Sequence, residues 1–290
     1  MPELPEVEGV VNSLKPVATG KTIEYVEISS VLQVSRQAGK QAIIKGSELE
    51  PFKQQLANAK ITQIVRRSKY IYFHLLKDQQ ELLLVTHLGM TGAWFYVQET
   101  ADIAEDKFRK HIHVIWKLDD GMLLVYADIR RFGEMRLMTS EDQFPPLLLM
   151  APEPFTESAL THFIEMSKLT KYQNKSIKET IMDGQVISGC GNIYATEALY
   201  RMHIHPGRKV KRISQKRLIP LFQMIVDVLN ESISAGGSSI SDYRNINGEA
   251  GGMQDRLQMY GKKQCPACLI PTKQVVLGGR NSWYCPSCQR

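Results

Sequence analysis

The sequence predicts an α+β protein, in which an N-terminal helix is followed by an antiparallel β-sandwich, a helical region and a small C-terminal hairpin finger. Three patterns indicate this class. Apolar residues recur at helical spacing near the start, they alternate with polar residues from about 22 to 140, and paired cysteines lie near the end. The 290 residues suffice for about two domains plus extras. We place the boundaries at 1–148, 149–261 and 262–290.

The first predicted element is a helix that begins within the first five residues. Glu6 and Glu8 lie in its first turn, where carboxylates complement the positive end of the helix dipole. Gly20, which follows Pro16, ends it. The face expected to be buried carries apolar residues three and four positions apart, namely Val7, Val10, Val11 and Leu14.

Pro2 is a candidate nucleophile, because removal of Met1 would leave it with a free secondary amine. An α-amino group titrates near ~7.7–8.0, so part of it is unprotonated at neutral pH. Its attack on an aldehyde-level carbon gives an iminium ion, as in a lysine Schiff base. The alternative is that Pro2 merely begins the chain and Pro5 occupies the first helical turn. Glu3 follows Pro2 directly, and Glu6 is either a supporting polar group or a surface acid.

The region from 22 to 140 is expected to form a two-layered antiparallel sandwich, because short segments in it alternate apolar and polar residues. Strands are predicted at 69–76 and 112–118. Asp120-Gly121 provides a hairpin turn before the strand at 122–126.

Beyond this region the pattern becomes helical. Pro145-Pro146 and Pro152–Pro154 mark the expected linker. Ser214 can cap a helix that contains Pro220. Proline is unfavourable inside a helix, and the sequence suggests no more than a kink at this position. The apolar face of this helix comprises Leu218, Leu221, Phe222, Ile225, Val228 and Leu229.

A glycine turn lies between two of the predicted helices. The first helix is expected to end near Gly184, and the next to start near Asn192, which would cap it. Such a helix start, preceded by Gly189 and Gly191, binds a phosphate well, although many helical corners look the same. Lys178 could reach that phosphate or could be an ordinary solvated lysine.

Charge is distributed unevenly along the chain. Lysine and arginine number 36 against 30 acidic residues, a net charge of +6. The last 35 residues, from Arg256, contain six basic residues and no acidic one. A basic tail favours a polyanionic partner, with a solvated surface as the alternative.

Four of the five cysteines are predicted to hold one structural zinc ion. They form two C-x-x-C pairs whose spacing suits a tetrahedral zinc site, while two disulfides remain the alternative. These ligands are Cys265, Cys268, Cys285 and Cys288. Between them, 275–284 is expected to form a hairpin, with Arg280 at the turn offered to a phosphate. Cys190 is expected to be a small packed residue.

The expected compartment is the cytosol. The apolar fraction of 43% and the charged fraction of 23% are ordinary for a soluble protein. No apolar run is long enough to span a bilayer, and the acidic start does not resemble a signal peptide.

Six motifs together resemble the bacterial formamidopyrimidine-DNA glycosylase family. They occur in the family's order and extend from residue 2 to residue 288. The motifs are Met-Pro-Glu-Leu-Pro-Glu-Val-Glu at the start, Arg66–Tyr70, His87–Gly92, Asp128–Gly133, Gly189–Tyr194 and the four-cysteine finger.

The resemblance implies a fold and a partner. The fold is an N-terminal helix on a β-sandwich, a helix–two-turns–helix domain and a zinc β-hairpin, with damaged double-stranded DNA in the cleft between them. The expected protein is a bacterial monomer. Its implied activity is excision of 8-oxoguanine and formamidopyrimidines, followed by strand cleavage through β- and δ-elimination.

The resemblance also implies residue roles. Pro2 attacks C1′ of the flipped nucleotide, Glu3 transfers protons at the sugar, Lys69 serves β-elimination and Arg280 δ-elimination. Glu6 supports them. DNA contacts are implied for His111 and Arg130 and phosphate contacts for Lys178 and Asn192, and the void left by the extruded base is filled by Met90, Arg130 and Phe132.

One departure concerns the segment 236–253, which resembles the family's base-capping loop. Family members often carry a basic residue where Ser241 stands, so the contacts to the everted base stay open.

Two rival interpretations remain. One is the endonuclease VIII branch, which excises oxidised pyrimidines, and Leu4 argues against it because that branch usually has glycine there. The other is a non-catalytic zinc-finger DNA-binding protein.

Overall fold

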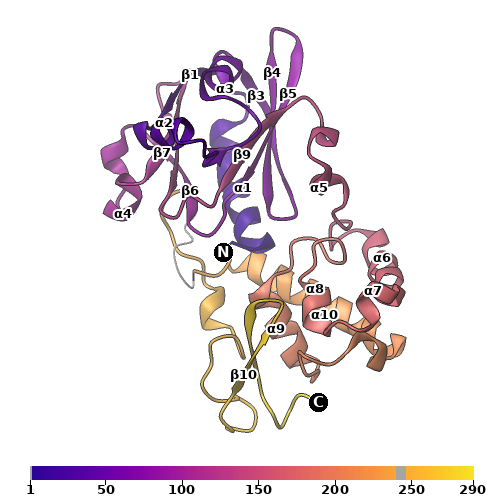
Figure 1. Ribbon diagram of the computed structural model, residues 1–290. Helices are drawn as coiled ribbons and strands as arrows, with labels where there is room; N and C mark the ends of the chain where they lie inside the picture. Colours follow the sequence, from indigo (N-terminus) through magenta and orange to yellow (C-terminus); the bar gives the residue numbers. More distant parts are fainter. Residues whose placement is uncertain (1, 240–245) are drawn as a thin grey trace. The chain divides into compact units, whose positions relative to one another are not determined.

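The computed structural model describes residues 2–239 and 246–290. They form two compact units, Met1–Leu148 with Gly236–Gly251 and Leu149–Ala235 with Gly252–Arg290 (Figure 1). The three-part division with a separate segment 262–290 stays a prediction. None of the described helices is long and apolar enough to cross a membrane.

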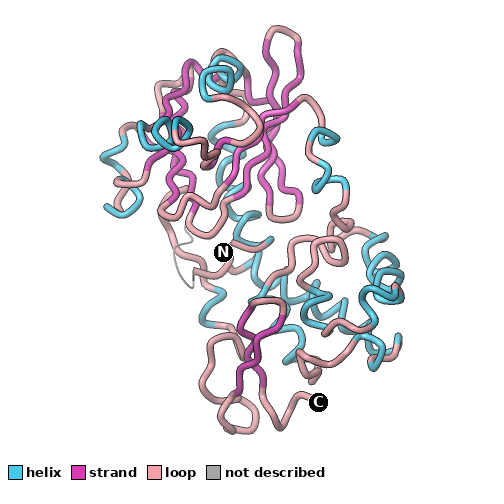
Figure 2. Tube along the Cα trace, in the orientation of Figure 1, coloured by secondary structure: helices cyan, strands magenta, loops and turns pink. Residues whose placement is uncertain are grey.

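The first unit contains the sandwich that the sequence predicts (Figure 2). One sheet has the order β1-β7-β8-β6 and the other the order β2-β9-β5-β4-β3. All neighbouring strands in these sheets are antiparallel except the two-residue β2, which pairs in parallel with β9. The strands are β1 (Ile23–Ile28), β2 (Ile43–Ile44), β3 (Lys60–Arg67), β4 (Tyr70–Lys77), β5 (Gln80–His87), β6 (Gly92–Val97), β7 (Ile112–Leu118), β8 (Leu123–Asp128) and β9 (Glu134–Met138).

The helix α1 (Leu4–Ala18) is close to its predicted bounds. It passes through Pro16 and ends two residues before Gly20, whose φ of +87° suits glycine. The four apolar residues predicted for its inner face are all buried. The helix contacts β3 and β4 of one sheet and β6 of the other.

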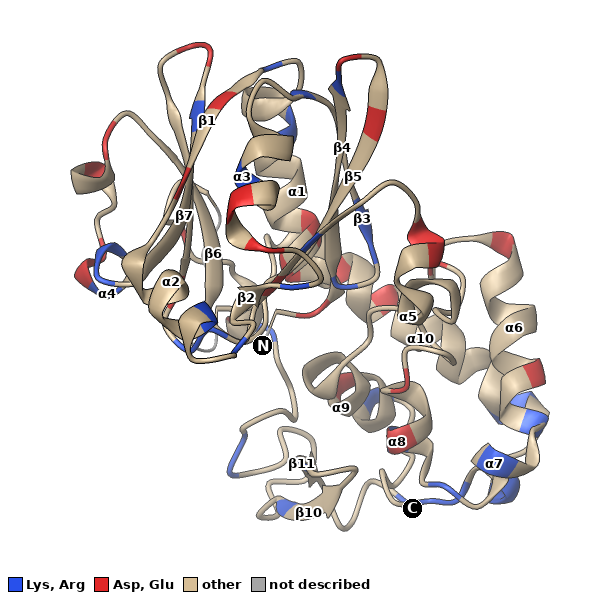
Figure 3. Cartoon of the chain, turned by 45° about the horizontal axis from the view of Figure 1, so that its top comes forward, with Lys and Arg blue, Asp and Glu red and all other residues tan. Residues whose placement is uncertain are grey.

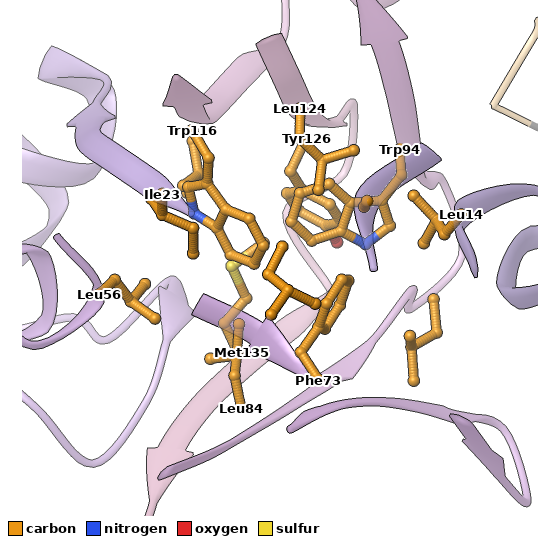
Figure 4. Packing of buried hydrophobic residues seen from close by; sticks show 14 of the residues in the cluster. Leu14, Ile23, Leu56, Phe73, Leu84, Trp94, Trp116, Leu124, Tyr126 and Met135 are labelled. Atoms are coloured by element: carbon orange, nitrogen blue, oxygen red, sulfur yellow. The ribbon is translucent and has the colours of Figure 1, made fainter. Parts of the chain in front are cut away.

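Aromatic side chains fill the space between the two sheets. Trp94 lies 5.0 Å from Trp116 and 5.1 Å from Tyr126, measured between ring centroids. Phe73 of the facing sheet lies 5.3 Å from Trp116 in an edge-to-face arrangement, a favoured geometry for aromatic pairs. Figure 4 shows these rings converging with aliphatic residues of the same cluster.

Short helices surround the sandwich, and the sequence analysis did not predict them. The Pro145-Pro146 pair, predicted to mark the linker, begins the short helix α5, because the fixed φ of proline suits a first helical turn, and α5 ends where the first unit meets the second along the chain. These elements are α2 (Ser30–Gln37), α3 (Leu49–Leu56), η1 (Thr100–Asp102), α4 (Asp106–Arg109), η2 (Glu141–Gln143) and α5 (Pro145–Leu148).

The second unit is mainly helical and includes the predicted hairpin. The long helix α10 begins after Ser214, as predicted, and passes through Pro220. It packs against α9 and α6, and α9 also contacts β11. The elements are α6 (Glu157–Lys168), α7 (Thr170–Gln173), α8 (Ile177–Ile181), α9 (Asn192–Arg201), η3 (Val210–Arg212), α10 (Gln215–Ser234), η4 (Met253–Asp255), β10 (Lys273–Leu277) and β11 (Arg280–Tyr284).

Two details of the glycine turn differ from expectation. The helix expected to run to Gly184 ends at Ile181, because the Asp183 carboxylate accepts the Gln185 amide at 3.0 Å and closes a turn. The cap residue of α9 is Gly191, and Asn192 is the first helical residue. The Asn192 side chain is therefore free of the capping role predicted for it.

Candidate functional site

Pro2 and Glu3 lie at the start of α1 in a buried position. Glu3 is only 3% exposed, although it carries a carboxylate. Its backbone amide donates to Oε2 of Glu6 at 2.8 Å, which is one half of a capping box. The position of Pro2 is thereby fixed through its neighbour in the chain.

Glu6 is a buried residue with a partner on each carboxylate oxygen. It is 1% exposed, so the alternative of a surface acid is wrong. While Oε2 holds the Glu3 amide, Oε1 accepts the Ser238 amide at 2.7 Å. Ser238 belongs to the segment that resembles the capping loop, so Glu6 connects that segment to the start of α1. Residues 240–245, with Ser241 among them, lie outside the described residues.

Lys69 lies in the tight turn between β3 and β4. The preceding Ser68 has a φ of +58°, in the left-handed region. Arg66 anchors this turn, because its Nε pairs with the Glu8 carboxylate and its Nη1 donates to the Ser68 carbonyl at 3.0 Å. Since Glu8 lies in α1, Arg66 ties the turn that carries Lys69 to this helix.

Met90, Arg130 and Phe132 are brought together on the surface of the first unit. The Arg130 Nη1 lies 3.1 Å from the Met90 sulfur, and the guanidinium lies 4.8 Å from the centre of the Phe132 ring. Phe132 is 56% exposed and Met90 36% exposed, although both are apolar. A Cβ on Gly89, whose φ is +60°, would lie 2.4 Å from the Phe132 backbone. Glycine at position 89 therefore allows the loop that carries Met90 to contact the loop that carries Phe132.

The buried carboxylate of Asp128 organises these loops. Its Oδ1 accepts the Thr91 hydroxyl at 2.6 Å and the Arg130 amide at 3.2 Å. Its Oδ2 accepts the Gly133 amide at 2.8 Å. Together these bonds hold the loop that carries Met90 and the loop that carries Arg130 and Phe132. Arg131, in the second loop, has a φ of +57°.

Two histidines lie near this network and differ in exposure. His111 is partly exposed, and its Nδ1 lies 2.6 Å from the Lys107 carbonyl. His113 is buried between the Ser29 hydroxyl and the Asp128 carbonyl, and burial lowers its pKa. His111 alone is therefore available on the surface.

His87 supports the turn that leads to Met90. Its Nδ1 accepts the Gly89 amide at 3.0 Å, and its ring lies 5.0 Å from that of Tyr70. Burial, with a smaller contribution from the nearby Lys69 ammonium, lowers the His87 pKa to about 4. The imidazole is therefore neutral at neutral pH, as its acceptor role requires.

In the second unit, the start of α9 meets the tip of the hairpin. Asn192 Nδ2 donates to the Asn281 carbonyl at 3.1 Å, directly beside Arg280. The turn is formed by Gly278 and Gly279, with φ of +53° and +72°, and joins Leu277 to Arg280 in register. The predicted hairpin is confirmed, and Arg280 is exposed at its turn.

Lys178 is fully buried, so the alternative of a solvated lysine is wrong. Its Nζ donates to the Thr196 hydroxyl at 2.6 Å. Thr196 donates in turn to the Asn192 carbonyl at 2.7 Å. The second unit thus places Lys178, Asn192 and Arg280 around the first turn of α9.

The four predicted cysteine ligands converge at one point. All four sulfurs lie within 4.8 Å of one another, with Cys265 and Cys288 at 3.8 Å and Cys268 and Cys285 at 3.4 Å. Sulfurs bound tetrahedrally at about 2.3 Å from zinc would be separated by roughly 3.8 Å. The group can therefore hold one metal ion, while Cys190 is buried elsewhere.

Neighbouring polar groups hold this cluster against α9. The Tyr200 hydroxyl lies 3.4 Å from the Cys265 sulfur. Burial opposes ionisation of this thiol, but the Tyr200 hydroxyl and nearby backbone amides outweigh it and lower the Cys265 pKa to about 6. The buried Glu197 accepts backbone amides from the segment that enters the finger, at Gln258, Met259 and Tyr260.

Sequence reasoning missed three of these supporting residues. Asp128 and His87 stand inside motifs that the resemblance used, and their only signal was a polar residue at the end of a strand. Glu197 lies in the helix α9 among apolar residues, where a carboxylate indicates a buried partner.

Comparisons with known proteins identify the family. Residues 1–135 match the family model of the formamidopyrimidine-DNA glycosylase N-terminal domain, and residues 150–244 match that of its H2TH domain. The chain belongs to the formamidopyrimidine-DNA glycosylase family. This membership agrees with the α+β fold, the helical region and the cysteine cluster described above.

Whole-length relatives support the same membership. The formamidopyrimidine-DNA glycosylase of Bacillus licheniformis is 35% identical, and that of Halalkalibacterium halodurans is 37% identical, each over 100% of both chains. The chain also resembles Lactococcus lactis Fpg in its complex with abasic-site DNA, with a TM-score of 0.82, 30% identity and full coverage of both chains. A variant of that protein bound to Fapy-dG DNA gives a TM-score of 0.83.

Proposed function

We propose that this member of the formamidopyrimidine-DNA glycosylase family is a bifunctional DNA glycosylase and abasic-site lyase of base excision repair. Its substrates are oxidised purines, 8-oxoguanine and formamidopyrimidines, in double-stranded DNA. The observation that carries the proposal is the position of Pro2 at the start of α1, held through the Glu3 amide by the buried Glu6. Once Met1 is removed, this fixed position presents a secondary amine.

The chemistry begins with attack of the Pro2 nitrogen on C1′ of the extruded nucleotide. The bond between C1′ and the base breaks, and the base leaves with a proton. The C1′–O4′ bond of the sugar then opens, O4′ takes up a proton, and the nitrogen lone pair forms the iminium. This iminium acidifies the C2′ protons, so loss of one breaks the bond from C3′ to the oxygen of the 3′ phosphate. A second elimination releases the 5′ phosphate. Each elimination removes a proton and a phosphate and needs no oxidant.

The supporting roles are those that the family resemblance implies. Glu3 transfers protons at the sugar, and Lys69 and Arg280 stabilise the departing phosphates, since arginine hardly deprotonates. From the first unit, His111 and Arg130 contact the bound duplex. From the second, Asn192 and Lys178 contact a phosphate, and the buried Lys178 ammonium reaches it by leaving the Thr196 hydroxyl. These contacts position the protein without reading sequence.

The exposed trio of Met90, Arg130 and Phe132 fills the space that the extruded base leaves. Extrusion costs a few kcal/mol of stacking, and apolar wedges inserted by other proteins offset such costs. The four cysteines would hold one structural zinc ion, which adds folding energy to the hairpin and takes no part in the reaction.

Borohydride trapping tests the proposed nucleophile. The protein is mixed with duplexes that contain either 8-oxoguanine opposite cytosine or an oxidised pyrimidine, and the cross-linked peptide is mapped. We expect an adduct on Pro2 with 8-oxoguanine, little adduct with Pro2→Gly, and none when Met1 is retained. Pro16→Ala, which changes an exposed proline at the other end of α1, is the matched control and should trap like the wild type.

Three outcomes would contradict the proposal. An adduct on a lysine would exclude the proline mechanism. Trapping with the oxidised pyrimidine alone would indicate the endonuclease VIII type. Binding of damaged DNA without any adduct, from protein shown by mass spectrometry to lack Met1, would indicate a non-catalytic DNA-binding protein.

A further inference from the structure

A strongly basic segment of the second unit has no place in the proposed reaction. Within the ten residues from Arg208 to Arg217, six are lysine or arginine and none is acidic. The segment connects α9 to α10 and includes η3. A dense run of one charge on a connection is typical of a surface that meets the opposite charge.

Backbone hydrogen bonds fix this segment beside α7 and α8. The Ile177 amide donates to the Arg208 carbonyl at 2.8 Å, and the Val210 amide donates to the Lys175 carbonyl at 3.2 Å. Ser176 and Lys209 form an isolated β-bridge. The segment is therefore a fixed part of the surface and lies against the end of α7.

The resulting basic surface consists of five exposed side chains from two stretches of the chain. The side chains of α7 and of η3 are brought together, and Figure 3 shows lysine and arginine gathered at α7. Lys211 Nζ donates to the Asn174 side chain at 2.7 Å, which links the two stretches directly. We define this basic surface as Lys171, Lys175, Lys209, Lys211 and Arg212.

Two carboxylates face the basic surface, and both have other partners. Glu179 accepts the Ser176 hydroxyl, and this bond, with smaller contributions from Lys209 and Lys175, lowers its pKa. Asp183 accepts the Tyr172 hydroxyl at 3.0 Å and lies 3.9 Å from Lys175. Positive charge on the basic surface therefore remains in excess.

Buried apolar residues lie beneath the basic surface and bring its cations together. Tyr172 and Val210 already form the buried layer there. The ammonium groups of Lys171 and Lys175 lie 4.7 and 5.0 Å from the Tyr172 ring centre, in cation–π geometry, so the ring brings these two like charges close together. Like charges so arranged repel one another, and a polyanion would relieve that repulsion.

The basic surface belongs to the same unit as the proposed phosphate site, and the backbone connects the two. The Lys178 amide donates to the Pro206 carbonyl at 3.2 Å, and the next two residues lead to Arg208. We propose that the basic surface binds the phosphate backbone of undamaged duplex flanking the lesion. This inference rests on the proposed DNA-binding function and extends it, since it adds contacts to DNA that the reaction does not use. Duplex DNA presents about one charge per 1.7 Å, so several phosphates can meet the five cations.

Titrations with two duplexes test the inference. Both carry the same abasic-site analogue, one in roughly 10 base pairs and the other in roughly 30, that is, about one and three helical turns. The wild type should bind the long duplex more tightly. In the triple variant Lys209→Gln, Lys211→Gln, Arg212→Gln, this advantage should fall about tenfold or more at low salt. The salt slope for the long duplex should decrease by roughly two to three units.

The matched control removes three lysines from the first unit. Lys15 lies in the last turn of α1, Lys60 begins β3 and Lys77 ends β4, all at the end of the sandwich away from Pro2. The variant Lys15→Gln, Lys60→Gln, Lys77→Gln should keep the advantage of the long duplex. Circular dichroism spectra should show that both variants are folded.

Two results would overturn the inference. If the triple variant lost affinity equally for both duplexes, its cations would belong to the central site. If neither affinity nor salt slope changed, the basic surface would not bind DNA, and an acidic protein would be the better candidate. A wild type that keeps the advantage of the long duplex but gives no Pro2 adduct would support this surface while refuting the proposed chemistry.

Discussion

The sandwich of the first unit and the cysteine hairpin of the second are stabilised in different ways. Between the sheets, Trp94, Trp116 and Phe73 pack with ring centroids 5.0–5.6 Å apart and are completely buried. In the hairpin, the buried cluster consists of Cys265 and Cys285 with Tyr200 and Met259, and both of the latter lie outside residues 262–290. The hairpin therefore has almost no apolar core of its own.

This difference separates the candidate residues by what holds them in place. Pro2, Glu3 and Lys69 depend on a core that needs no ligand. Arg280 depends on four thiols that attract a metal and on carboxylate contacts such as those of Glu197. Perturbations of metal, core and protonation should therefore affect the two regions unequally.

Metal removal should have the largest effect. We expect one zinc ion per chain, and we expect Cys268→Ser or Cys288→Ser to unfold the hairpin, because zinc supplies about 10–16 kcal/mol to structural sites of this kind. DNA binding should be lost while the sandwich stays folded. Elemental analysis, DNA titration and, in a Trp283→Phe background, the fluorescence of Trp94 and Trp116 measure the three quantities.

Cys190→Ser provides the control for this prediction. Cys190 is buried but lies outside the cluster of four, so its substitution should leave the zinc content at one. Active protein without zinc, or equal loss of zinc in Cys190→Ser, would show that the metal assignment is wrong. Unfolding of the sandwich on metal removal would show that the two regions are not independent.

Truncation of the aromatic core should have the next largest effect, and it should act on the sandwich. Trp94→Ala removes a side chain that is 0% exposed, and such changes cost about 3–5 kcal/mol of the free energy of unfolding. Tyr25→Ala, which changes a 46% exposed aromatic residue of β1, is the control and should cost much less. Chemical denaturation at constant zinc measures both. Similar losses in the two variants would contradict the role given to the buried rings.

The elements that sequence reasoning predicted are those whose signal is local. The apolar residues of α1 recur every three or four positions, and the C-x-x-C pairs place ligands at fixed spacing, so neither depends on distant contacts. α2 was missed because Leu32 is its only buried residue among exposed ones. Such a short helix carries little periodicity.

The features of the site that the sequence did not predict depend on partners far along the chain. The role of Asp128 requires Thr91, which lies 37 positions earlier, and the burial of Lys178 requires Thr196. Pairings of this kind have no periodic signature. Asn192 was recognised as a polar residue at the start of a helix. Its hydrogen bond to the Asn281 carbonyl depends on the position of the hairpin, which the sequence does not give.

The smallest expected effect is a dependence of the sandwich stability on pH through His87. Burial and the Lys69 ammonium lower the His87 pKa to about 4, against 6.5 for the ordinary side chain, and Glu134 opposes this only in part. As pH falls below about 6.5, the unfolded state takes up the proton first. Stability should therefore be complete above about pH 6.5 and be lost progressively toward pH 4, by up to about 3 kcal/mol.

The variant His87→Asn tests this, since its amide oxygen can still accept the Gly89 amide while the side chain no longer titrates. We expect the difference in unfolding free energy between pH 4.5 and pH 7, two values chosen for the assay, to become smaller in His87→Asn. Trp283→Phe is used as the background, because Trp94 and Trp116 then report on the sandwich alone. His113, whose pKa is also lowered by burial, contributes equally to both proteins. The control is His203→Asn, which changes an exposed histidine and should leave the pH dependence as it is. An unchanged pH dependence in His87→Asn would show that the proton is taken up by another group.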